Sequence, residues 1–119
     1  MNEYLDTTRF NYAQALTQGD ADIIGIMGQA FLDACPAHLE ELNDAITRHD
    51  AELLHRSAHT MKGLVGNFMA EPVERHAKAL EMQGKQGDFS ESGMTQQALV
   101  EEIGRMNQAL AAFLIQRPD

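Results

Sequence analysis

Apolar residues recur along most of the chain at steps of three and four, which is the spacing of one face of an α-helix. This spacing predicts one long helix from Asp20 to about Arg48, with a kink at Pro36, because a proline inside a helix removes a backbone hydrogen bond. A shorter helix is predicted over residues 7–17, and Gly19 ends it. The apolar stripe of the long helix consists of Ile24, Met27, Phe31, Cys35, Leu39, Leu42 and Ile46.

Three further helices are predicted after Arg48. Asp50 is predicted as the N-cap of the first of them, and Pro72 suits the first turn of the second, which ends near Gln83. The glycine-rich stretch 84–93 reads as the longest loop, and the last helix follows it. The three stripes are Leu54, Ala58, Met61, Val65 and Phe68; then Val73, Ala77 and Leu80; then Leu99, Ile103, Met106, Leu110 and Phe113.

These elements predict an all-α fold, since no stretch alternates like a strand. Short connections favour antiparallel neighbours, so we expect an antiparallel up-down four-helix bundle with a short extra N-terminal helix. A chain of 119 residues fits one domain, residues 1–119 with a core of about 5–115. The four stripes are sufficient for a monomeric core.

Charge and cysteine content narrow the classes of partner. Eighteen acidic residues against nine basic ones give a net charge of −9, which disfavours nucleic acid as a ligand. No apolar run reaches the length that crosses a bilayer, so membrane insertion is not expected. Cys35 is the single cysteine, so no intrachain disulfide can form. A reducing, cytoplasmic location is therefore expected.

The helix predicted after Asp50 carries a histidine away from its apolar stripe. At about 100° per residue, His59 lies nearly opposite the stripe and should point to solvent. Gly63 and Gly66 follow one and two turns later, and each costs a helix about 1 kcal/mol relative to alanine. Glycines there clear space around the imidazole for another protein. Lys62, three residues after His59, can reach a group bound to the ring.

The same helix contains a local gap in the negative charge. From Leu53 to Ala70 there is no Asp or Glu, whereas the window holds His55, Arg56, His59 and Lys62. We therefore expect a neutral to positive face that suits one small anion, with His55, Arg56 and Gly66 as partner-docking residues beside the long helix.

A solvent-exposed neutral imidazole is a competent nucleophile toward a phosphoryl group, and an ammonium such as Lys62 would stabilise the phosphoryl oxygens. The sequence has no glycine-rich nucleotide loop and no cluster of aspartates placed for Mg²⁺. The phosphoryl group would therefore come from another protein. We expect a phosphoryl carrier rather than an enzyme, with no cofactor of its own.

Residues 58–63, Ala-His-Thr-Met-Lys-Gly, resemble the AHTLKG signature of histidine phosphotransfer (HPt) domains. The resemblance continues through Gly66, Asn67, Ala70 and Leu80-Glu81, and upstream through Gly19-Asp20, Phe31, Leu39 and Leu42, covering roughly residues 5–115.

The resemblance implies that His59 is phosphorylated on Nε2, that Lys62 steadies the phosphoryl oxygens and that Gly63 leaves room for the partner. That partner would be a receiver domain of a response regulator or of a hybrid sensor kinase, carrying an aspartyl phosphate and its own Mg²⁺. Departures from the family pattern fall at Leu64, Val65 and Met69.

Two other functions stay open from the sequence. A helical module that binds receivers without carrying phosphate would have the same fold. His55 lies four residues before His59 and three after Glu52, spacings that occur at metal sites of helical bundles. Such a site needs further ligands, and the four stripes have no inward-facing acid, so we expect none. His38, His49 and His76 are interpreted as surface or boundary residues, and Cys35 as a packing residue.

Overall fold

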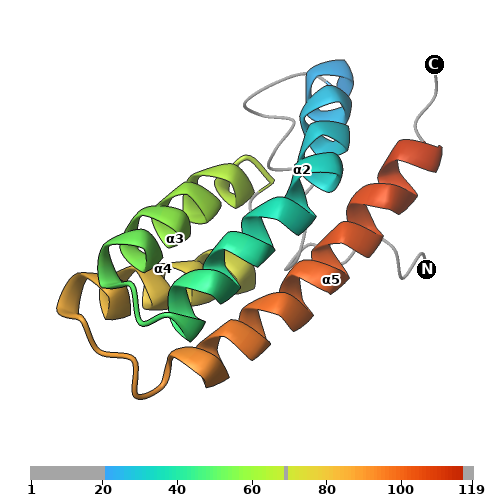
Figure 1. The fold of residues 1–119 in the computed structure, drawn as a ribbon. Helices are drawn as coiled ribbons and strands as arrows, with labels where there is room; N and C mark the ends of the chain where they lie inside the picture. Colours follow the sequence, from blue (N-terminus) through green and yellow to red (C-terminus); the bar gives the residue numbers. More distant parts are fainter. Residues whose placement is uncertain (1–20, 69, 117–119) are drawn as a thin grey trace.

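Four α-helices account for most of the part of the chain that the computed structural model describes, residues 21–68 and 70–116 (Figure 1). They are α2 (Ala21–Thr47), α3 (Ala51–Gly66), α4 (Glu71–Gln86) and α5 (Ser92–Gln116). No strand occurs among the described residues, so the all-α prediction is confirmed. The short helix expected over residues 7–17 lies outside them.

Each helix packs against two others, so that the four surround one shared core. The packed pairs are α2 with α3, α3 with α4, α4 with α5, and α2 with α5. All members of the four predicted apolar stripes lie in this core or pack partly buried against it. The side chains that are fully buried and bulky are Leu42, Leu54, Met61, Val65, Phe68, Val73, Leu80, Leu99, Ile103, Met106 and Leu110.

Two predicted helix starts are confirmed. Asp50 is the N-cap of α3, and its Oδ1 accepts a hydrogen bond from the backbone N–H of Leu53 at 3.0 Å. Pro72 occupies the first turn of α4, where its missing N–H costs nothing. Between α2 and α3, His49 adopts a positive φ of 53°, and its ring stacks on Phe89 with centroids 4.6 Å apart. This stack joins the α2–α3 turn to the loop before α5.

The predicted boundary near Gln83 is wrong. Helix α4 continues to Gln86, with Gly84 inside it, and ends at Gly87, whose φ of 67° lies in the left-handed region that glycine tolerates. Helix α5 begins at Ser92, so the loop is shorter than the stretch 84–93. Gly84 is buried against α3 rather than exposed in a loop, which its residue type alone did not reveal.

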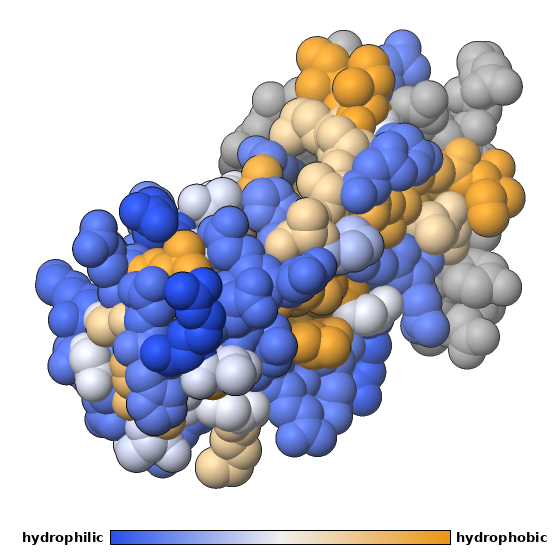
Figure 2. Space-filling view, in the orientation of Figure 1, coloured by the Kyte–Doolittle hydropathy of each residue, from blue (hydrophilic) through white to orange (hydrophobic). Residues whose placement is uncertain are grey.

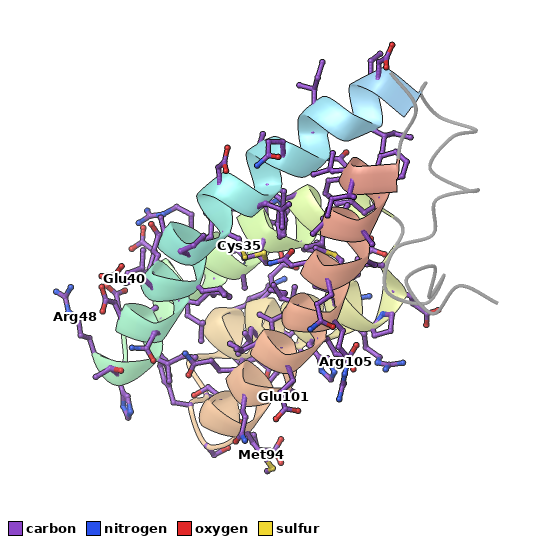
Figure 3. The ribbon with its side chains drawn as sticks, turned by 90° about the vertical axis from the view of Figure 1, so that its right-hand side faces the viewer. Cys35, Glu40, Arg48, Met94, Glu101 and Arg105 are labelled. Atoms are coloured by element: carbon purple, nitrogen blue, oxygen red, sulfur yellow. The ribbon has the colours of Figure 1, made fainter. Side chains whose placement is uncertain are left out.

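The charged side chains lie outside this core. Glu40, Arg48, Glu101 and Arg105 point away from the bundle, whereas Cys35 points into it (Figure 3). Burial raises the pKa of the Cys35 thiol, so this cysteine is a packing residue as expected.

The surface in Figure 2 is hydrophilic over much of its area, and orange apolar side chains gather where α2 begins and α5 ends. Ile23, Ile26 and Ile115 are the large exposed apolar residues of these two helix ends. Among the described residues, no helix combines the length and the apolar character that crossing a membrane requires.

Replacing the N-cap of α3 tests the local basis of this fold. Asp50→Ala removes the acceptor for the Leu53 N–H, and we expect the free energy of unfolding to fall by about 0.5–2 kcal/mol in urea titrations. Asp44→Ala, an exposed carboxylate within α2, is the matched control and should change it by no more than about 0.5 kcal/mol. Equal losses in both variants would contradict the capping role.

Candidate functional site

His59 lies on the exposed face of α3, as the helical wheel predicts. Its side chain is 65% exposed, whereas its neighbour Ala58 is fully buried. The helix therefore holds the backbone of residue 59 rigidly against the core while the imidazole ring reaches solvent. A partner protein can reach this ring without any opening of the bundle.

One carboxylate of the neighbouring helix holds the histidine. Glu81, on α4, has its Oε2 2.5 Å from His59 Nδ1. The other oxygen of the same carboxylate, Oε1, accepts a hydrogen bond from Lys62 Nζ at 2.7 Å. The Glu81 side chain is only 12% exposed, so it lies between α3 and α4 rather than in free solvent. Glu81 thus ties together the two side chains that the sequence singled out.

The contact with Glu81 assigns the two ring nitrogens of His59. An ionised carboxylate can only accept hydrogen bonds, so Nδ1 of a neutral imidazole must carry the hydrogen that it donates to Oε2. The lone pair of the neutral ring is then on Nε2, on the opposite side of the ring from Glu81. This tautomer is the one required for nucleophilic attack through Nε2.

The charge state of Glu81 supports this assignment. The hydrogen bond from Lys62 lowers the pKa of the Glu81 carboxyl below its ordinary value. Partial burial opposes that shift, and the hydrogen bond with His59 adds to it. The carboxylate is therefore ionised at neutral pH and available as a double acceptor.

Glu81 adds an acidic group to the face around His59. No Asp or Glu lies between Leu53 and Ala70 along the chain, but α4 places a carboxylate directly beside His59 and Lys62. Counting charge along one helix did not reveal this carboxylate, which pairs with the ammonium of Lys62. Helical spacing within α3 gives Glu81 no role, and its signal in the sequence is the Leu80-Glu81 pair of the family resemblance.

The expected docking residues of the preceding turn behave differently from one another. His55 Nε2 lies 3.9 Å from Glu81 Oε2, and its ring centroid is 6.5 Å from that of His59. Arg56 instead faces Glu52 on the same helix, 3.9 Å away, and both side chains are largely exposed. His55, His59 and Lys62 thus form one group around Glu81, whereas Arg56 lies outside this group.

The two glycines of α3 also differ. A Cβ added at Gly63 would meet nothing within 4 Å, so this position next to His59 is open. A Cβ at Gly66 would lie 3.2 Å from Oε1 of Glu74 on α4. Gly66 therefore borders the neighbouring helix, and Gly63 is the glycine that leaves free space beside the ring.

A hydrogen bond joins α2 to α3 close to His59. Ser57, which is nearly buried, donates a hydrogen bond from Oγ to Oε1 of Glu41 on α2. Ser57 is two residues before His59, so the contacts with α2 and α4 fix this turn of α3 from both sides. Within the described residues, no group of three or more His, Cys, Asp or Glu side chains is arranged to hold a metal ion.

Removing Lys62 tests the electrostatics of Glu81. In Lys62→Met, we expect the pKa of Glu81 to rise toward its ordinary value in a ¹³C NMR titration, because its strongest hydrogen bond is lost. A lowered carboxyl pKa stabilises the fold above the ordinary value of about 4.3, and this contribution disappears as the pH falls through the lowered pKa. The stability gap between wild type and Lys62→Met should therefore be present at neutral pH and vanish in acid.

The exposed Arg48 supplies the control for this titration. Arg48→Met removes one positive charge at the turn after α2 and should leave the pKa of Glu81 unchanged. A Glu81 pKa that stays low in Lys62→Met would show that the contact with Lys62 is not its cause.

Comparison with known proteins adds a family to this geometry. A scan against family models matches the Hpt domain over residues 27–113, which include His59, Lys62 and Glu81. A search of curated proteins and a search of solved structures each found no match. Hpt domains are phosphocarriers that interact with response-regulator receiver domains and with sensor kinases. Because the match spans most of the chain and contains the whole group around Glu81, this chain belongs to the Hpt domain family, the phosphotransfer modules of two-component systems.

Proposed function

We propose that this chain carries a phosphoryl group on Nε2 of His59 between the aspartates of receiver domains in a phosphorelay. The observation that carries the proposal is the contact of Nδ1 with Glu81, which leaves Nε2 as the nucleophilic nitrogen of an exposed ring. A histidine without a role would need neither a fixed tautomer nor a lysine bound to the same carboxylate.

The transfer step balances without any proton leaving the site. The Nε2 lone pair attacks the phosphorus of a receiver aspartyl phosphate, and a P–N bond forms as the P–O bond to the aspartate breaks. The electron pair of that bond returns to the receiver's carboxylate. The His59 ring keeps its Nδ1 hydrogen and becomes positively charged beside the Glu81 carboxylate. The reverse sequence delivers the phosphoryl group to a second receiver.

Lys62 has two interactions in this scheme, one with Glu81 and one with the phosphoryl group. It is bound to Glu81, and it lies one turn from His59 on the same face of α3. Its ammonium can therefore stabilise the negative charge that spreads over the phosphoryl oxygens during transfer. The Mg²⁺ that assists transfer would lie on the receiver, and this chain would act as a monomeric carrier.

The partner docks on the exposed face of α3 around His59 in this proposal. Gly63 supports that placement, because the space beside it is open and a receiver can approach the ring closely. His55, Arg56 and Gly66 flank the same face, and α2 adjoins it through the Ser57–Glu41 hydrogen bond.

Replacing the acceptor is the direct test. After incubation with a phosphorylated receiver, wild type should gain an acid-labile, base-stable phosphohistidine, and His59→Gln should gain none. His76→Gln, a change on α4 outside the group around Glu81, is the control and should accept label like wild type. Label on His59→Gln at the wild-type rate would overturn the assignment, and receiver binding without any label would identify a binding module instead.

The role of Lys62 predicts a change in rate rather than in binding. Lys62→Ala should slow single-turnover transfer by roughly tenfold to a hundredfold, because one positive charge near the phosphoryl oxygens is lost. The control is Lys85→Ala, which replaces an exposed lysine of α4 and should leave the rate close to wild type. Equal rates for Lys62→Ala and wild type would refute the electrostatic role.

A further inference from the structure

Gly84 marks the place where α4 touches the backbone of α3. A Cβ built at Gly84 would lie 2.5 Å from the backbone N of His55 and 2.8 Å from its Cα. It would also lie 3.0 Å from the backbone O of Ala51. Backbone atoms inside a helix cannot turn aside as the end of a side chain can. The absence of a side chain at residue 84 is therefore a condition of this helix spacing.

Other glycines of the bundle do not share this environment. A Cβ at Gly104, within α5, would meet nothing within 4 Å, and the same holds for Gly63. At Gly66 the neighbour is the end of the flexible Glu74 side chain. The close contact at Gly84 is thus a property of its position between α3 and α4, not of glycines in this fold generally.

The contact at Gly84 lies one helical turn from the phosphotransfer site on both helices. Glu81 precedes Gly84 by three residues on α4, and His55 precedes His59 by four residues on α3. Residues spaced by three or four lie on the same face of a helix, about 5 Å apart. The distance between the helices at Gly84 and His55 therefore sets how far the Glu81 carboxylate extends over His59 and Lys62.

We propose that Gly84 is a positioning residue for phosphotransfer, which acts by holding α4 close enough to α3 for Glu81 to bind both His59 and Lys62. The inference rests on the proposed function of His59. A methyl group at residue 84 would need roughly 1 Å of extra separation to reach ordinary van der Waals contact with the α3 backbone. The same displacement would stretch the 2.5 Å and 2.7 Å contacts of Glu81 beyond hydrogen-bond length.

The test is a double-mutant cycle on single-turnover transfer from a labelled receiver. Gly84→Ala should slow transfer by roughly tenfold to a hundredfold, since misplacing a group near the reacting atoms by about 1 Å can cost that much. In a Glu81→Gln background, the same substitution should have little further effect, because the group that it displaces has already lost its charge. Gly104→Ala adds a methyl group to a helix where space is free, so it should transfer at the wild-type rate.

The outcomes separate this inference from the proposed function. If wild type accepts no label, the proposed function fails. If wild type accepts label and Gly84→Ala does so equally fast, the role of Gly84 is refuted. If Gly84→Ala slows transfer as much in the Glu81→Gln background as in wild type, Gly84 acts through something other than Glu81, which also refutes the proposal.

Two measurements keep the test independent of how well Gly84→Ala folds. In wild type, NMR should show a nuclear Overhauser effect between the Hα atoms of Gly84 and the amide hydrogen of His55, and its absence would overturn the proposal. Gly84→Ala is also made together with Gly104→Ala, since alanine favours the helix and adds stability. In this double variant the pKa of Glu81 should rise above its wild-type value, and an unchanged pKa would contradict the displacement.

Discussion

The chemistry of this protein depends on two helices coming close enough for one carboxylate of α4 to bind two side chains of α3. Glu81 accepts hydrogen bonds from His59 on one oxygen and from Lys62 on the other. Its charge is maintained because the ammonium of Lys62 lowers its pKa. The exposed imidazole, its tautomer and the nearby positive charge therefore meet at one contact between helices, one helical turn from the place where α4 approaches the backbone of α3 at Gly84.

The side chains that stabilise the bundle are different from those of the candidate site. The fully buried apolar side chains of α2, α3, α4 and α5 hold the fold, while the imidazole ring of His59 lies on the opposite face of α3. Helix α3 keeps the backbone of His59 in one place, and the exposed ring is accessible to another protein. Hydrogen bonds from Ser57 to α2 and from His59 to α4 fix this turn from both sides.

Much of the fold follows from local rules. The steps of three and four predicted the core faces of four helices, and Asp50 and Pro72 marked helix starts because their chemistry acts within one turn. The prediction failed at Gly84, since a glycine reads as a loop signal unless a second helix is known to lie against it. The end of α4 was misplaced for that reason.

The sequence by itself determined the residues on one helix face, because helical spacing alone places His59, Lys62 and Gly63 within one turn of one another. It also showed that no acid lies between Leu53 and Ala70. Only the tertiary structure decided that Glu81, 22 residues along the chain from His59, enters this face from α4. Helical periodicity describes neighbours within one helix, whereas contacts between helices depend on how closely two backbones pack. The packing of α4 against α3 therefore decided which hydrogen bonds the site makes and placed Glu81 where Lys62 lowers its pKa.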